Sequence, residues 1–292
     1  MTYDKFGIPI SDISGRNDST RTIYAGKFAG EMSDLRFNSD FGFRSGDKGT
    51  HTSRTMMLAE LSALIAICGS DSSREAYATA IIEDNALGKA TVSTRKLSAQ
   101  RLTELYGLDR AIPIFRQLLR VWDFDPAGQA LTALLVALAR DPLLRSTAPS
   151  VLELSPGQVF DRELMAEGLR TATKDRLNDS TLDKVVRNAA SSWAQSGHME
   201  GRTFKKRILV RPTAGPVVMA LFLGFLQGIR GPGILRSFWC QALDAPPEVL
   251  ARIASTASMS GLIRFRMAGD VIDVSFPEIL TATEIEALHE SN

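Results

Sequence analysis

The apolar positions along the chain follow a mainly helical pattern. In one segment after another they recur every three or four residues, which is the spacing of one face of an α-helix. The segments cover residues 54–67, 72–84, 93–108, 109–121, 126–140, 158–170, 180–196, 214–227, 232–243, 246–260 and 281–289. This succession predicts a mainly α fold, built as a helical bundle.

Two stretches depart from the helical spacing. From Leu262 to Phe276, apolar and polar residues alternate around a turn at Ala268–Asp270, which predicts a β-hairpin. The helix over 180–196 begins at Asp179 or Ser180 and ends at Gly197, and a basic segment with a short β-forming run follows it. Helices followed by small hairpins predict winged-helix-like units within the bundle.

Three regions follow from the pattern. Residues 1–50 are rich in Asp, Ser, Gly and Asn without a sustained period, which predicts an irregular N-terminal arm. The aromatic residues of the arm could pack on the body or hold a partner. Ser155-Pro156-Gly157 suggests a boundary between an N-terminal helical domain, 51–154, and a C-terminal helical domain with winged-helix-like elements, 155–292. A single helical body across Ser155 is the alternative.

Composition indicates a soluble globular protein. The chain has 292 residues, of which 44% are hydrophobic and 23% charged, and its formal net charge is +1. The longest apolar run, residues 216–227, is shorter than the roughly 20 residues that span a bilayer. Because the N-terminus lacks the build of a signal peptide and there are only two cysteines, we expect a cytoplasmic protein without membrane contact.

Positive charge is concentrated in one region. Between Arg170 and Arg211 there are ten Lys/Arg and four Asp/Glu, a local excess of 10 − 4 = +6, so the remainder of the chain sums to −5. A basic cluster beside a helix with outward Arg and Asn is suited to neutralising phosphates and reading a DNA groove. A solvated helix face, or a surface for an acidic protein, is the alternative.

The candidate nucleic-acid-binding residues lie in three places. The first is the 180–196 helix and the basic segment after it, the second is the outward face of the C-terminal hairpin, and the third is the 93–108 helix. The residues are Lys184, Arg187, Asn188, Arg202, Lys205, Lys206, Arg207 and Arg211, then Arg264 and Arg266, and lastly Arg95 and Lys96. The basic helix at 93–108 could equally be an ordinary amphipathic surface helix.

Signatures of catalysis and metal binding are missing from the sequence. His51, His198 and His289 have no second ligand at metal-binding spacing, and Cys68 and Cys240 are far apart. The glycine-rich segment 228–233 does not match a phosphate-binding loop, and there is no nucleophile elbow. We therefore expect a non-enzymatic protein without a metal ion or cofactor.

With these elements in order, residues 54–280 resemble the BrxA family of bacteriophage exclusion (BREX) defence systems. The resemblance lies in the basic helix STRKLSAQRL, the leucine-rich middle LTALLVALARDPLLR, and above all LNDSTLDKVVRNAASSWAQSGHMEG. It implies a mainly helical cytoplasmic protein that binds double-stranded DNA and works with other BREX-type proteins, and it supplies no catalytic residue. Residues 1–50 lie outside the resemblance.

The sequence thus predicts a non-enzymatic component of an anti-phage defence system that binds duplex DNA mainly through the phosphate backbone. Two alternatives stay open. A scaffold role would use the basic surface to dock an acidic partner, and RNA binding would fit the helical body, although no RNA-recognition motif is visible.

Overall fold

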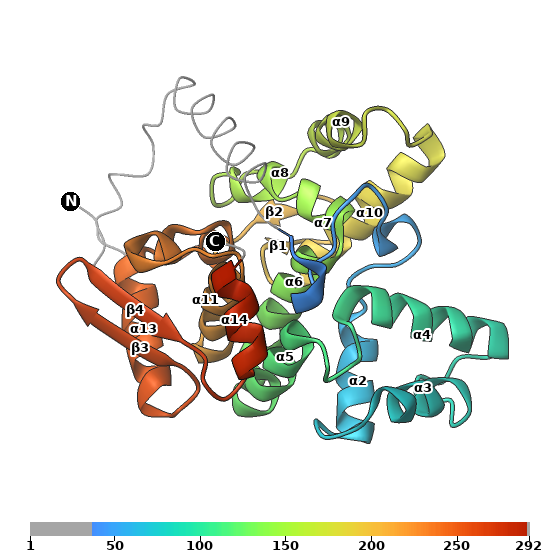
Figure 1. Cartoon of the computed structure of the whole chain (residues 1–292). Helices are drawn as coiled ribbons and strands as arrows, with labels where there is room; N and C mark the ends of the chain where they lie inside the picture. The colour runs from blue at the N-terminus through green and yellow to red at the C-terminus, as the bar shows by residue number, and fades with distance from the viewer. Residues whose placement is uncertain (1–36, 291–292) are drawn as a thin grey trace. The chain divides into compact units, whose positions relative to one another are not determined.

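The computed structural model describes residues 37–290, which fall within one compact unit of the chain. Helices dominate it, and the strands of this part form two small antiparallel sheets, so the mainly α prediction is confirmed (Figure 1). None of the helices in the described range is long and apolar enough to cross a membrane.

The first three helices form a separate layer beside the centre of the molecule (Figure 1). They are α2 (Leu58–Cys68), α3 (Arg74–Ile82) and α4 (Val92–Tyr106). The Ser73 side chain accepts a hydrogen bond from the Ala76 amide and caps α3, and Thr91 caps α4 in the same way. Tyr77, Leu102 and Leu105 turn inward and are buried.

The core is built on three apolar helices. They are α5 (Pro113–Phe124), α6 (Gln129–Arg140) and α11 (Ala214–Leu226), and α11 packs against both of the others. Almost every residue of α11 is buried, because its apolar positions go all the way round the helix and not along one stripe. Since α5 and α6 precede residue 155 and α11 follows it, the core contains segments from both predicted domains, and the boundary stays a prediction.

The first helix–hairpin unit lies between α6 and α11. It contains α7 (Pro142–Ser146), α8 (Pro149–Leu152), α9 (Arg162–Thr173) and α10 (Asp179–Gln195), then β1 (Met199–Glu200) and β2 (Lys206–Arg207). β1 and β2 pair antiparallel, and Val159 bridges to Lys206 on the other edge of β2. Of these elements, only α9, α10, β1 and β2 are meant below by the name first unit.

The second helix–hairpin unit follows α11. It begins with the 3-10 helix η5 (Gly231–Arg236) and α12 (Phe238–Gln241), continues with α13 (Pro247–Met259), and ends with the hairpin of β3 (Arg264–Ala268) and β4 (Val271–Ser275). The last helix is α14 (Ala282–Glu290). One prediction here is corrected: residues 232–243 form η5 and α12, because Ser237 is extended and caps α12. Of these elements, only α12, α13, β3 and β4 are meant below by the name second unit.

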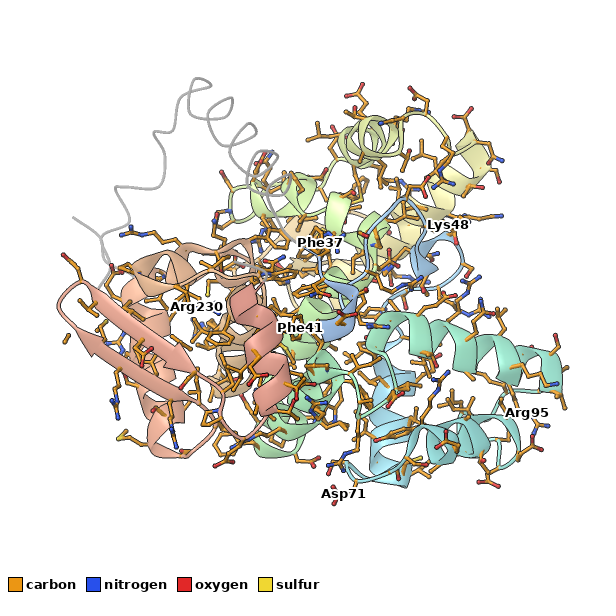
Figure 2. All side chains as sticks on the ribbon, in the orientation of Figure 1. Phe37, Phe41, Lys48, Asp71, Arg95 and Arg230 are labelled. Atoms are coloured by element: carbon orange, nitrogen blue, oxygen red, sulfur yellow. The ribbon has the colours of Figure 1, made fainter. Side chains whose placement is uncertain are left out.

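Residues 37–57, here called the strap, run across the body as two short 3-10 turns, η2 (Ser39–Phe41) and η3 (Thr50–Thr52). The part of the predicted arm that the structure describes is irregular but packed: Phe41 and Phe43 are buried, and the Phe43 ring lies 5.9 Å from that of Trp239. Phe37 and Phe41 are labelled in Figure 2 at the start of the strap. The aromatics of this part therefore pack on the body; residues 1–36 of the arm lie outside the described residues.

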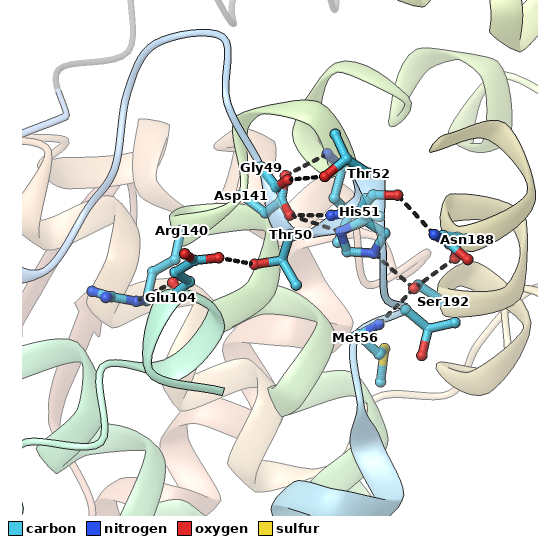
Figure 3. A network of polar contacts seen from close by, with 12 residues as sticks. Gly49, Thr50, His51, Thr52, Met56, Glu104, Arg140, Asp141, Asn188 and Ser192 are labelled. Atoms are coloured by element: carbon cyan, nitrogen blue, oxygen red, sulfur yellow. Dashed lines mark hydrogen bonds and ion pairs between the residues drawn. The ribbon is translucent and has the colours of Figure 1, made fainter. Parts of the chain in front are cut away.

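A buried polar network fastens the strap (Figure 3). The His51 Nδ1 atom lies 2.8 Å from an Asp141 oxygen, and its Nε2 atom lies 2.8 Å from the Ser192 Oγ atom on α10. Burial raises the pKa of Asp141, but the His51 ring and hydrogen bonds from His51 and Leu144 outweigh burial and hold that pKa below its usual value. The network joins the strap to α7 and α10.

Candidate nucleic-acid interface

Helix α10 presents a polar stripe to solvent. Its first amide groups are capped by the Asn178 side chain, which accepts from the Thr181 amide. The cap therefore lies one residue before the predicted Asp179 or Ser180, and the helix itself begins at Asp179. The apolar residues 182, 185, 186, 189, 190 and 193 face the body. Ser180, Lys184 and Arg187 therefore share the opposite side, at the i, i+4, i+7 spacing of one helix face. Lys184 and Arg187 are exposed, as expected.

Asn188 does not belong to this stripe, contrary to the prediction that it points outward. Its side-chain amide donates a 2.8 Å hydrogen bond to the His51 carbonyl oxygen in the strap. One turn later, Ser192 joins the same network. This side of α10 holds the strap in place, so the Asn188 side chain is not available to a DNA base.

Acidic neighbours balance part of the positive charge on the first unit. Asp183 lies 2.8 Å from Arg162 of α9 and 3.0 Å from Arg187. Arg170 is 2.9 Å from Asp179, and Arg176 pairs with Asp47. Asp179 and Asp183 are already subtracted in the count of +6 over residues 170–211, but Asp47 lies outside this range. The count therefore overstates the charge that this surface offers to phosphate groups, because Asp47 balances Arg176.

Strand β2 of the first hairpin is hydrogen-bonded along both of its edges. Besides the Met199–Arg207 and Glu200–Lys206 pairs, the Gly157 amide donates to the Arg207 carbonyl, and the Phe160 amide donates to the Lys205 carbonyl, each at 2.8 Å. Residues 157–160, which precede α9, thus lie along β2 in the position of a third strand. The turn of residues 201–205 projects from a fixed base.

Arg207 lies on the inner side of this hairpin, and the prediction that it contacts nucleic acid from the surface is corrected. Only 2% of the residue is exposed. Its guanidinium pairs with Asp244, in the loop after α12, and also donates to the carbonyl groups of His198 and Ile208. Strand alternation explains the placement: Lys206 points outward, so the next residue points inward.

His198 is buried beside this ion pair. Its Nε2 atom lies 2.8 Å from the Ala242 carbonyl oxygen, and its ring packs edge-on against Trp193 at 4.9 Å. Burial disfavours the charged ring and lowers the pKa of His198 to about 4, although Asp244 opposes the shift. The base of the first hairpin therefore holds a neutral histidine at neutral pH.

The exposed end of the first hairpin keeps several candidate cations. Arg202 and Lys206 are exposed and have no ion-pair partner among the described residues. Lys205 is half-buried, and its Nζ atom lies 3.3 Å from the Gly201 carbonyl oxygen. Arg211 is exposed in the segment that leads to α11.

The second unit carries a sparser group of exposed cations. Arg264 and Arg266 alternate with buried Phe265 on β3 and are exposed, as predicted for one face of the hairpin. Arg252 is exposed on α13, the helix that packs on β3. Within the range that the structure describes, none of the three arginines forms an ion pair. The second unit thus offers fewer cations than the first. Asp273 lies opposite Arg266 in the hairpin, so part of this charge is balanced nearby without an ion pair.

The candidates on the third predicted helix lie apart from both units, at the outer end of α4 (Figure 2). The Arg95 guanidinium donates hydrogen bonds to the carbonyl groups of Ile82 and Glu83 at the end of α3. Lys96 is exposed. Arg95 therefore stabilises the α3–α4 turn, which favours the interpretation of α4 as an ordinary amphipathic helix.

The described residues contain no cluster of three His, Cys, Asp or Glu side chains that could hold a metal ion. Ser192, His51 and Asp141 are connected in the order of a nucleophile, a base and an orienting acid. However, Ser192 and His51 are completely buried, and the Ser192 oxygen also accepts from the Met56 amide and donates to the Asn188 carbonyl. No substrate can reach that oxygen in this arrangement, so the network has a structural role.

Two residues that matter for this surface were not predicted from the sequence. Asp244 is a lone acid before Pro246 and gives no local sign that it balances an arginine 37 positions earlier. Phe204 lies within the basic run Arg202–Arg207, and 74% of it is exposed. An aromatic residue inside a basic turn after a glycine was the available signal for Phe204.

The comparisons with known proteins add no relative. Neither a protein-family model, nor a curated protein, nor a solved structure matches the chain. The resemblance to the BrxA family accordingly stays a prediction from the sequence.

Proposed function

We propose that the chain binds duplex DNA through two surfaces: α10 with the β1–β2 turn, and α13 with β3. One observation carries the proposal. In both units, exposed cations without an ion-pair partner among the described residues lie on the last helix and on the hairpin that follows it. They are Lys184, Arg202 and Lys206 in the first unit and Arg252, Arg264 and Arg266 in the second.

The order of elements supports the proposal. In each unit a longer helix follows a shorter one and leads directly into an antiparallel hairpin, as in winged helix-turn-helix proteins. In those proteins the second helix enters the major groove, while the rest of the unit contacts the backbone. The exposed sides of α10 and α13 carry serine and arginine, which hydrogen-bond to phosphates and base edges.

Electrostatics sets the expected strength of binding. Each phosphate that a lysine or arginine neutralises contributes about 0.9 to the slope of log affinity against log salt. If all six cations contact phosphates, the slope would be about −5. Because these contacts are made to the phosphate backbone, we expect largely sequence-independent binding that weakens steeply with salt.

The test is binding of a fluorescent mixed-sequence duplex by anisotropy at several salt concentrations. Lys205→Glu/Lys206→Glu probes the first surface and Arg264→Ala/Arg266→Ala the second. Each phosphate contact that is lost should reduce the slope by about 1. The control Arg74→Ala/Arg110→Ala removes two exposed charges, one on α3 and one in the loop after α4, and should leave the slope unchanged. Wild-type affinity in both surface variants would refute the proposal, and structured RNA as a competitor at equal ionic strength tests the RNA alternative.

The biological setting that we propose is a BREX-type defence system in the cytoplasm, and it rests on the resemblance of residues 54–280 alone. Removing the gene from such a locus should restore phage plaque formation, and Arg264→Ala/Arg266→Ala should do so in part. Full restriction of phage in the absence of the gene would contradict this setting.

A second candidate, docking of a partner protein, is favoured by a separate observation. Leu164 on α9 and Leu209 after β2 are about half exposed, near charges that are already balanced by ion pairs. A docking protein should keep the other defence proteins in a pull-down after nuclease treatment, whereas a DNA-mediated association should be lost.

A further inference from the structure

Phe204 is the most exposed aromatic side chain in the described part of the chain, at 74%; the next is Phe124, at 47%. A single exposed apolar residue is common on protein surfaces and needs no explanation by itself. The position of Phe204 does need an explanation, because the residue lies at the end of the β1–β2 hairpin, which is part of the proposed DNA-binding surface.

The turn that carries Phe204 is held in a defined shape. Gly201 has a φ of +100°, and a Cβ atom at this position would lie 2.3 Å from the Phe204 carbonyl oxygen. The chain therefore folds back closely on itself, which only glycine permits. The next residue, Lys205, accepts the Phe160 amide on its carbonyl group, and Arg207 anchors the end of β2 through Asp244.

The charges around Phe204 favour an anionic ligand. Residues 200–206 contain Arg202, Lys205 and Lys206 against Glu200, a sum of 3 − 1 = +2. Glu200 and Lys206 lie opposite each other at the base of the hairpin, whereas Arg202 and Lys205 lie on the turn itself. In proteins that bind nucleic acid, aromatic side chains stack on bases while neighbouring cations bind the phosphates. Phe204, with a cation on either side of it in the sequence, fits this arrangement.

We propose that Phe204 is a wedge that inserts beside a base pair and bends the duplex bound by the first unit. The inference rests on the proposed DNA binding and adds the class of contact: stacking on bases, without hydrogen bonds that read their identity. Such a wedge favours steps that unstack easily, mainly pyrimidine–purine steps, and not a defined sequence. A protein partner for the ring is the competing explanation; the surrounding cations favour nucleic acid.

The test uses Phe204→Trp as a reporter and Phe204→Ala as the loss variant. The three native tryptophans, Trp122, Trp193 and Trp239, are buried, so a tryptophan at position 204 would be the exposed one in the described part. A duplex rich in TA steps should quench its emission and protect it from acrylamide. Phe204→Ala should weaken binding by roughly five- to a hundredfold, the effect of losing one stacked base. It should also abolish the bend seen by energy transfer between the duplex ends.

Val92→Trp and Val92→Ala are the matched controls, because Val92 is a half-exposed apolar residue on α4, outside both units. Each variant should unfold at the same temperature as the wild type, which would show that the fold is intact.

If Phe204→Ala binds and bends DNA like the wild type, the wedge is refuted while DNA binding stands. If the wild type does not bind duplex at all, the proposed function fails with it. If Phe204→Ala instead loses a defence protein in nuclease-treated pull-downs and keeps DNA affinity, the ring is a protein anchor and the wedge is again refuted.

Discussion

The two hairpins use arginine in opposite ways. On β2, Arg207 faces inward and pairs with Asp244, whereas on β3 Arg264 and Arg266 face solvent on either side of buried Phe265. The sequences of both strands are basic, and only the alternation of each strand against the body decides which cation is hidden. A basic run therefore gives the number of charges in a segment but not the number at the surface.

The buried ion pair also shows what holds the first hairpin. β1 and β2 have only two residues each, too few to be stable through their own hydrogen bonds. Arg207 links β2 to the loop after α12 and to the His198 carbonyl, so the hairpin is fixed by tertiary contacts. The second hairpin has five residues in each strand and packs Phe265 and Val274 into the core.

The largest expected effect comes from breaking the buried pair. Arg207→Ala leaves Asp244 without its partner, at 7% side-chain exposure, and we expect the free energy of unfolding to fall by about 3–5 kcal/mol. Guanidinium unfolding followed by circular dichroism measures the loss. Arg266→Ala is the matched control on the other hairpin and should change stability by less than about 0.5 kcal/mol.

A small effect of Arg207→Ala would mean that Asp244 recovers water contact when the arginine is removed. In that case, the Arg207→Ala/Asp244→Ala double variant should be no more stable than the single one. A double variant that regains much of the loss would instead support the unpaired buried charge as its cause.

The next effect concerns pH. The pKa of His198 is about 4 in the folded chain because the ring is buried, against about 6.5 in an unfolded chain. Between these values the unfolded chain binds a proton that the folded chain does not, so stability falls as pH decreases through this window. The full difference is about 3 kcal/mol. His198→Gln should flatten the dependence between pH 6.5 and 4.5 in unfolding experiments, and an unchanged slope would contradict the assignment.

The helices were largely predictable because their apolar faces are local in sequence. The spacing predicts α10 and α13 to within a residue or two, and the alternation from Leu262 to Phe276 predicts the second hairpin and its turn. The broken segment at 232–243 was not predicted, because its division at Ser237 depends on how η5 packs against β4 and α13.

The surface was much less predictable, since partners distant in the sequence decide it. The helical spacing predicts that Asn188 points outward. Its hydrogen-bond acceptor is the His51 carbonyl oxygen in the strap, 137 positions earlier, and the local sequence gives no sign of this contact. The buried state of His51 likewise depends on Asp141 and Ser192, which come from separate helices. Lys184, Arg264 and Arg266 were placed correctly at the surface because helix and strand periodicity alone determine their direction.

A smaller effect compares the turns of the two hairpins. Gly201→Ala places a Cβ atom against the Phe204 carbonyl at a positive φ, and should destabilise the chain by about 1–3 kcal/mol. Gly269→Ala, in the turn between β3 and β4, also has a positive φ, but its Cβ atom would meet nothing within 4 Å. Its loss should be about 1 kcal/mol. Equal losses in thermal unfolding would show that the first turn relaxes around the added methyl group.

A small change in stability is also expected for Asp183→Asn, which removes the shared partner of Arg162 and Arg187. Because these ion pairs are exposed, their loss should cost less than about 1 kcal/mol. The same change leaves two arginines free on the α9–α10 surface, so duplex affinity should rise several-fold at low salt, with a steeper salt dependence. Asp71→Asn adds the same net charge between α2 and α3 and should leave affinity unchanged. A damaged fold cannot bind DNA more tightly, so a gain confined to Asp183→Asn would assign the first surface to DNA, whereas no gain would limit the interface to the second unit.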